Sequence, residues 1–146
     1  MFKFSIVIPV YNESKNLTIL TKKIYRVLKD KKFELIIVDD DSTDGTSKIL
    51  KKIKKKNMRF FIRKKDKDLC KSCILGFQKS KYSNVLVMDG DMQHRPKDIL
   101  KLIDVFQTKD ADFVIGSRNL FRKKKHNLSF FRLVASRILI LIVNLF

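Results

Sequence analysis

The chain has 146 residues, 45% of them hydrophobic, which is enough for one domain with a substantial core and excludes wholesale disorder. Its net charge of +18 at pH 7 would attract polyanions, whether phosphorylated substrates, anionic lipid or nucleic acid. Because the lysines form loose clusters without interleaved aromatic residues, we expect solvated basic faces and no nucleic-acid partner.

Strand-like apolar runs alternate along the chain with apolar residues at helical spacing. The first strand-like run ends around Pro9, Tyr11 and Asn12, and the fourth, Val85 to Met88, predicts a buried strand. Repeated βα units of this kind predict an α/β protein with a mostly parallel sheet covered by helices on both faces. We expect strands at residues 4–10, 33–38, 60–62, 85–88 and 113–115, and helices at residues 17–28, 49–53, 69–77 and 99–106.

Two carboxylates separated by one glycine follow the fourth strand. Asp89 and Asp91 would lie on the same side of an extended segment, and Gly90 would let a ligand approach the backbone closely. This arrangement suits Mg²⁺, which takes one or two carboxylates together with substrate phosphates. The alternative is an ordinary acidic turn before the next helix, near whose first turn Pro96 lies.

Ligands bind such sheets beyond the carboxyl ends of the strands, so the residues that follow each strand are the candidates for one site. Carboxylates there could bind a metal or accept hydrogen bonds from a base or ribose, and an arginine could pair with phosphate. Taken singly, each residue could instead be a core-edge aromatic, a helix N-cap or a surface cation. The candidates are Pro9, Tyr11 and Glu13 after the first strand, Asp39, Asp40 and Asp41 after the second, Asp89 and Asp91 after the fourth, and Ser117 and Arg118 after the fifth.

Cys70 and Cys73 are the chain's two cysteines and form a C-x-x-C. A zinc site would need further ligands, and His94 and His126 are poorly spaced for it, while a redox pair would need a lowered thiolate pKa. We expect two small buried thiols on one helix face, in a reducing compartment. The N-terminus enters a strand-like run directly, so we expect no signal peptide.

Four segments carry a recognisable order of motifs: residues 6–13 (IVIPVYNE), 37–46 (IVDDDSTDGT), 88–94 (MDGDMQH) and 115–118 (IGSR). They resemble the motifs of family 2 glycosyltransferases with the GT-A fold, and most of all the dolichol/polyprenyl-phosphate mannose synthase branch. The resemblance covers nearly the whole chain. It implies a Rossmann-like GT-A sheet and a nucleotide-sugar donor, GDP-mannose or a UDP-sugar.

The resemblance also implies roles for individual residues. Asp89, Asp91 and Gln93 would coordinate Mg²⁺ or Mn²⁺ across the diphosphate, with Gly90 against the nucleotide. Arg118 would contact the diphosphate, so that Asp91 and Arg118 are the expected catalytic residues. The residues expected to hold the nucleoside and ribose are Pro9, Tyr11, Glu13, Val38 and Asp40.

The implied reaction moves a mannose- or glucose-like sugar, with inversion, to a polyprenyl or dolichyl phosphate. Negative charge develops on the leaving diphosphate, where the metal and Arg118 would stabilise it. A lipid phosphate is already an anionic nucleophile, so no strong general base is required. This agrees with the lack of an obvious catalytic histidine, although His94 lies beside the acidic motif.

The chain departs from the family pattern in two places. Residues 68–76 stand where many relatives carry a glycine-rich loop, and the chain ends at Phe146, before a Ser-Gly-Phe-like motif and the basic residues that shape the acceptor side. We therefore expect a C-terminally truncated enzyme, with a nucleotide-sugar-binding core at residues 1–128, that binds donor but transfers sugar poorly.

Residues 129–146 are strongly apolar, but Arg132 and Arg137 interrupt them and leave too short a run to cross a bilayer, which needs ~20 apolar residues. One interpretation is an interfacial helix, with basic residues 122–125 on anionic headgroups. The other is a helix that packs against an absent C-terminal segment. We expect a cytoplasmic protein, peripheral at the cytoplasmic face of the membrane, with a lipid-phosphate acceptor and an anionic membrane surface as partners.

Two other function classes stay open. A phosphoacceptor regulatory domain would carry its acidic pair after the first strand and a lysine at a later strand end, which this chain does not show. A non-catalytic module that binds nucleotide sugars is the main alternative to an enzyme. Turnover with a polyprenyl phosphate would separate these classes.

Overall fold

The computed structural model describes residues 2–64, 66–109 and 111–117. The chain divides after Asp112 into two compact units, of which the second begins at Phe113. The boundary expected near residue 128, and everything expected of the apolar tail, lie outside the described residues. The first unit contains all the helices and strands among those residues.

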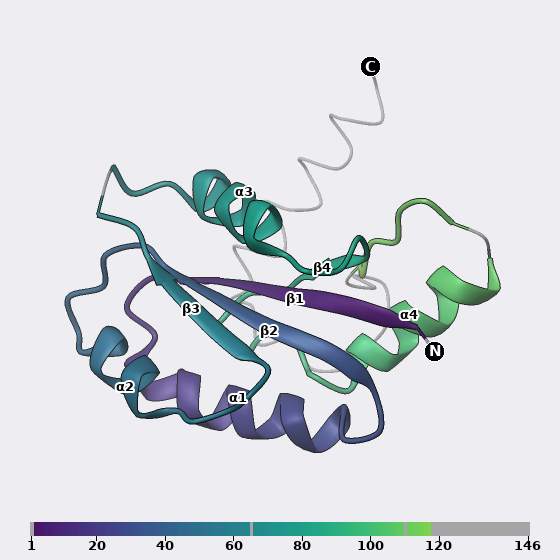
Figure 1. Ribbon diagram of the computed structural model, residues 1–146, viewed down its shortest axis with the longest axis horizontal. Coiled ribbons are helices and arrows are strands. Elements are labelled where there is room, and N and C mark those ends of the chain that lie inside the picture. Colours follow the sequence, from purple (N-terminus) through teal and green to yellow (C-terminus); the bar gives the residue numbers. More distant parts are fainter. Residues whose placement is uncertain (1, 65, 110, 118–146) are drawn as a thin grey trace, which may run out of the picture. The chain divides into compact units, whose positions relative to one another are not determined.

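Strands β1 (Lys3–Val10), β2 (Lys32–Asp39), β3 (Met58–Ile62) and β4 (Val85–Val87) form one parallel sheet in the order β3-β2-β1-β4 (Figure 1). β1 pairs with β2 along its whole length and with β4 over three residues. Because all pairs are parallel, the four carboxyl ends face the same edge of the sheet. The predicted parallel α/β sheet is confirmed.

Helices α1 (Ser14–Val27), α2 (Thr46–Lys52) and α4 (Asp98–Thr108) cover one face of the sheet, and α3 (Leu69–Lys79) covers the other. Alternation along β1 separates the two cores, since side chains point to opposite faces in turn. Ile6 and Ile8 pack in the larger core with Leu17 of α1 and Ile99 of α4, whereas Val7 packs toward α3. Figure 1 shows α1 and α2 on the side of the sheet opposite to α3.

Gly76 brings α3 close to the centre of the sheet. A Cβ atom at this position would lie 2.2 Å from Cγ1 of Val7, far inside any real carbon–carbon contact. The helix therefore lies on β1 at a distance that only glycine allows, which holds the start of α3 beside the carboxyl edge.

A buried carboxylate joins the amino ends of the strands. Glu34 on β2 accepts hydrogen bonds from the Ser5 hydroxyl of β1 (2.7 Å), from Arg59 of β3 (2.8 Å) and from the Lys81 backbone N–H. Burial alone would raise the pKa of Glu34, but the hydrogen bonds from Lys81, Ser5 and Arg59 outweigh it and hold the pKa below its ordinary value. Three strands and the segment before β4 are thus tied at the edge opposite to the candidate site.

The first strand ends at Val10, as expected, with Pro9 opposite Val38, where β4 has already ended and the missing N–H removes no bond to that strand. Two other expectations about strands need correction. β4 is an edge strand among the described residues, so its Val85 and Val87 are 38% and 43% exposed rather than buried. Residues 113–115 form no strand, because an apolar triplet becomes a strand only when it pairs with a neighbour.

The expectation of two buried thiols is also wrong. Cys70 is exposed and Cys73 is partly buried, and both are free thiols on α3. Ser72 and Gly76 form the buried side of this helix instead, because the close approach to β1 leaves room only for small side chains there.

Candidate functional site

The loops that follow β1 and β2 are tied to each other at the carboxyl edge of the sheet. The Asp40 N–H donates to the Val10 carbonyl (2.9 Å), and the Asn12 side chain accepts from the Thr43 N–H (2.9 Å). In return the Asn12 N–H donates to the Ser42 hydroxyl (2.8 Å). Asn12 and Asp41 adopt left-handed backbones, with φ of 57° and 58°, which asparagine and aspartate tolerate better than most residues. These contacts give the two loops one defined arrangement.

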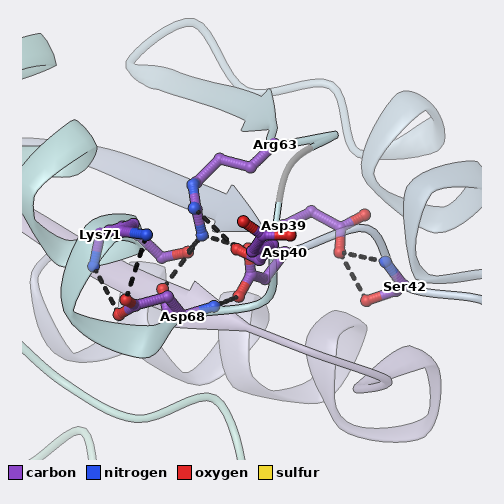
Figure 2. Close-up of polar contacts among 8 residues, drawn as sticks. Asp39, Asp40, Ser42, Arg63, Asp68 and Lys71 are labelled. Carbon is purple, nitrogen blue, oxygen red and sulfur yellow. Dashed lines mark hydrogen bonds and ion pairs between the residues drawn. The ribbon is translucent and has the colours of Figure 1, made fainter.

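Asp39 has a structural part in that arrangement. It is fully buried, and its carboxylate accepts from the Ser42 N–H (3.1 Å) and the Ser42 hydroxyl (2.5 Å) (Figure 2). Its second oxygen accepts from the Ser47 hydroxyl of α2 (2.6 Å). The N-cap position of α2 is the left-handed Gly45, not one of the three aspartates. Asp39 therefore fixes the loop between β2 and α2 and presents no carboxylate to a ligand.

Asp40 forms a buried ion pair with Arg63, which directly follows β3 (Figure 2). The side chains of Arg63 and Asp40 are 9% and 8% exposed. The second oxygen of Asp40 accepts from the Asp68 N–H (2.7 Å), and Arg63 also donates to the Asp68 carbonyl and to the Ser72 hydroxyl, both at 3.0 Å. The ends of β2 and β3 and the first turn of α3 are thereby held in one polar network.

Asp68 is the N-cap of α3 within this network. Its side chain accepts from the Lys71 N–H (3.0 Å), and this bond lowers the pKa of the Asp68 carboxyl, with a further contribution from the nearby charges of Lys71 and Arg63. The start of α3 is therefore fixed to the sheet edge by both backbone and side-chain bonds.

Tyr11 lies at the exposed side of the same edge. Its side chain is 44% exposed, and Lys67 contacts it both through its hydroxyl (2.5 Å) and over its ring (4.3 Å to the centroid). The bond to Tyr11 raises the pKa of Lys67, and the charges of Asp41 and Asp40 add to this effect. An accessible aromatic ring and a cation thus lie together beside the Asp40 network, which suits stacking on a base and attraction of phosphate.

The acidic loop after β4 returns to the end of β1. Gly90 is buried there, and a Cβ atom on it would lie 2.8 Å from Cγ1 of Val10 and 3.5 Å from Cγ of Glu13. Packing of this loop against β1 therefore requires a glycine at this position. The neighbouring Asp89 is exposed and Asp91 is partly buried, so both carboxylates flank a backbone that is pinned to β1.

Asp89 and Asp91 each contact a residue of the segment that follows them. Asp89 contacts Nε2 of His94 (3.1 Å), and one oxygen of Asp91 accepts from the Gln93 N–H (2.9 Å). Among the described residues no group of three or more His, Cys, Asp or Glu side chains is placed to hold a metal. Two carboxylates of this kind nevertheless fit a Mg²⁺ or Mn²⁺ ion that completes its coordination with a diphosphate, because such ions take few protein ligands.

The structure thus brings most of the expected residues to one edge. Pro9 and Val38 are register partners buried in the last pairs of β1 and β2. Glu13 is the N-cap residue before α1, and its carboxylate accepts from the Asn16 side chain (2.7 Å). Arg118 lies outside the described residues, and Ser117 belongs to the second unit.

Arg63, Lys67 and Asp68 are site residues that the sequence reasoning missed. The signal that points to them is the third strand, which also ends at this edge, so the rule applied to the other strands would have indicated Arg63 immediately after Ile62. The ion pair itself joins residues 23 positions apart and leaves no local pattern.

Comparison of the sequence with known proteins identifies the family of this chain. Residues 5–137 match the family model described as glycosyl transferase family 2. A dolichol-phosphate mannosyltransferase of Pyrococcus furiosus is 36% identical over 136 residues, which cover 92% of this chain and 38% of the relative. The dolichol-phosphate mannosyltransferase of Saccharomyces cerevisiae is 31% identical over 80% of this chain and 45% of its own length. An undecaprenyl-phosphate 4-deoxy-4-formamido-L-arabinose transferase of Proteus mirabilis is 30% identical over 94% of this chain and 42% of its own length.

Solved structures show the same fold. Residues 1–349 of TarS from S. aureus in complex with UDP-GlcNAc superimpose with a TM-score of 0.63 at 23% identity, covering 84% of this chain and 39% of that one. The mannosyltransferase PcManGT from Pyrobaculum calidifontis, in complex with GDP-Man and Mn²⁺, gives a TM-score of 0.57 at 20% identity over 66% of this chain and 30% of that one. The chain spans well under half the length of these proteins.

Proposed function

Because the chain belongs to glycosyl transferase family 2, we propose that its carboxyl sheet edge binds the nucleotide-diphosphate part of a nucleotide-sugar donor. The observation that carries this proposal is the arrangement of Tyr11, the Asp40–Arg63 pair and the Asp89–Asp91 loop around the end of β1. An exposed ring, a buried carboxylate, and the exposed Asp89 and partly buried Asp91 are the kinds of groups that a base, a ribose and a metal-bound diphosphate would need.

Each residue has a defined part in this proposal. Tyr11 stacks on the base, and Asp40 accepts from the base or ribose, because Arg63 and Asp68 occupy two of its roughly four lone-pair positions. Asp89, Asp91 and Gln93 face the diphosphate and would hold Mg²⁺ or Mn²⁺ with it. Pro9 and Val38, which are buried in the sheet, would support the nucleoside side from below, with Glu13 beside them, and Gly90 keeps the acidic loop against β1.

The proposed reaction transfers a mannose- or glucose-like sugar, with inversion, to a polyprenyl or dolichyl phosphate. This acceptor class is supported by the three relatives that are named for dolichol or undecaprenyl phosphate. The divalent ion supplies positive charge at the leaving diphosphate, and Arg118 adds a cation there. The acceptor phosphate is already anionic, so His94 need not act as a base and can remain the partner of Asp89.

Calorimetric titration of the 146-residue chain with GDP, GDP-mannose, UDP and UDP-glucose, each with Mn²⁺ or with EDTA, tests donor binding. One nucleotide series should bind, and EDTA or Asp91→Ala should weaken its diphosphate affinity at least about tenfold, the loss of a charged contact of ~1.5–3 kcal/mol. Asp104→Ala is the matched control, because Asp104 is an exposed carboxylate on α4, and it should bind like the unaltered chain. Affinity that is unchanged by both EDTA and Asp91→Ala would rule out the proposed diphosphate site.

We also propose that the protein works at the cytoplasmic face of a membrane, where a lipid-phosphate acceptor lies. Among the described residues no helix is long and apolar enough to cross a bilayer. Attraction to the membrane would come from the apolar residues 129–146 and the basic residues 122–125. Each cation would add a binding free energy of about 1 kcal/mol near an anionic surface. In liposome flotation, binding should require anionic lipid, weaken with salt and disappear when residues 130–146 are deleted. Equal flotation with neutral lipid would contradict this mode of attachment.

A module that binds nucleotide sugars without transferring them is the second candidate. The contacts described at the sheet edge, from Tyr11, Asp40 and the Asp89–Asp91 loop, account for binding of a donor and would serve such a module equally well. Incubation with labelled donor and polyprenyl phosphate separates the two candidates, because only an enzyme forms glycolipid while both bind donor.

A further inference from the structure

The first two turns of α3 carry both cysteines of the chain. Cys70 lies one residue after the start of the helix and is exposed, and Cys73 lies three residues later and is partly buried. Because the sequence has two cysteines in all, any disulfide within one molecule must join these two. Neither thiol has a part in the proposed binding of the donor.

Helix geometry places the pair within bonding range. With a rise of 1.5 Å and a turn of 3.6 residues, Cα atoms three positions apart lie about 5 Å from each other, inside the range of about 4.4–6.8 Å seen in disulfides. Their Cβ atoms are about 5–6 Å apart in a regular helix, whereas a disulfide needs about 3.5–4.5 Å. Closing the bond therefore draws the Cβ atoms together by about 1–2 Å and distorts this part of the helix.

That same turn is built into the site. Asp68, the N-cap, donates its N–H to Asp40 and accepts from Arg63 through its carbonyl, and Ser72 accepts from Arg63 with its hydroxyl. Asp68 and Ser72 bracket Cys70 in the sequence, and Ser72 immediately precedes Cys73. A change in the spacing of the cysteines must shift at least one of these bonds.

The two thiols differ in exposure. Cys70 is exposed and Cys73 is partly buried, so Cys70 is the thiol that reacts first with a soluble partner.

We propose that Cys70 and Cys73 form a reversible disulfide within α3, and that this bond weakens nucleotide binding at the adjacent site. The second part rests on the proposed function. The oxidant is a low-molecular-weight disulfide of the glutathione class. The site is thus a thiol-modification site that lowers donor affinity under oxidising conditions.

The exchange proceeds in two balanced steps. The Cys70 thiolate attacks one sulfur of the soluble disulfide, forms a mixed disulfide and releases one soluble thiolate, which takes up a proton. Cys73 then loses its proton and attacks the Cys70 sulfur, which forms the Cys70–Cys73 bond and releases the second soluble thiol. Two protein thiols are oxidised and one soluble disulfide is reduced, and excess reduced thiol reverses the reaction.

The experiment equilibrates the full 146-residue chain with glutathione buffers of increasing oxidised fraction and measures three quantities. Intact mass and peptide mapping report the internal bond as the loss of two hydrogens between Cys70 and Cys73. Amide exchange at residues 68–72 reports the helix start, and calorimetry with the nucleotide and Mn²⁺ reports the site. The controls are Cys70→Ser, Cys73→Ser and the double variant, none of which can close the bond.

We expect the internal bond to form, amide exchange at residues 68–72 to accelerate, and nucleotide affinity to fall about tenfold or more, with full recovery on reduction. The double variant should bind like the reduced chain in every buffer. Failure of the internal bond to form in excess glutathione disulfide would overturn the proposal. So would a bond that alters neither exchange nor affinity, or an equal loss of affinity in the single variants through mixed disulfides. If the reduced chain binds no nucleotide, the proposed function fails, and mass and amide exchange still decide the disulfide.

Discussion

Removing Arg63 from its pair with Asp40 should cost more stability than most single substitutions at the sheet edge. Arg63→Met keeps the apolar stem but removes the guanidinium that bonds Asp40, Asp68 and Ser72. Both charged side chains are less than 10% exposed, so the substitution leaves a buried carboxylate without its cation. Breaking such a pair from one side costs about 3–5 kcal/mol. With a urea dependence of about 2 kcal/mol per molar, the unfolding midpoint should fall by about 2 M.

The assay is urea unfolding followed by circular dichroism, with a second substitution that tests the cause. Adding Asp40→Asn to Arg63→Met removes the stranded charge, so the double variant should be more stable than Arg63→Met alone. Arg26→Met is the matched control, because Arg26 is exposed in the last turn of α1, and it should change stability by no more than about 0.5 kcal/mol. A loss below about 1 kcal/mol for Arg63→Met, or no recovery in the double variant, would refute the reasoning.

Two further predictions concern the opposite edge and the helix contact. Because the folded-state pKa of Glu34 is lowered, its contribution to stability should be present above its ordinary pKa of 4.5 and lost as pH falls through the lower folded value. The difference in urea midpoint between the chain and its Glu34→Gln variant should therefore shrink as the pH falls below 4.5, and a constant difference would contradict this. Gly76→Ala should lower stability by about 1–3 kcal/mol in thermal unfolding, since its Cβ would meet Val7, and Val7→Ala should restore part of the loss; a stabilised Gly76→Ala variant would show that α3 can move away.

The order of helices and strands could be predicted from local pattern because each element buries a continuous apolar face. The runs that became β1, β2 and β3 and the spacing that became α1 to α4 are all legible in the sequence. Burial of β4 could not be predicted in this way, because its exposure depends on the place of the strand in the sheet. The same holds for residues 113–115, which would need a partner strand.

The candidate site could be predicted in part. Tyr11, Asp40 and the acidic pair follow from the rule that ligands lie beyond strand ends. That Asp40 is bonded to Arg63, or that Gly90 faces Val10, depends on which loops meet in space, and no local spacing records it. The proposed metal and nucleotide contacts stay predictions that the titrations above can decide.

The strand order has a consequence for how the chain is made. Of the strands that the structure describes, β1 is synthesised before the others, yet it lies inside the sheet, and its neighbour β4 follows roughly 80 residues later. At a synthesis rate of about 5–20 residues per second, one side of β1 waits about 4–16 s for its partner. During that interval Ile6 and Ile8 also lack the cover of α4, which is made later still. The nascent chain thus carries an open apolar strand edge for seconds, a natural point of contact for the chaperones that meet it at the ribosome.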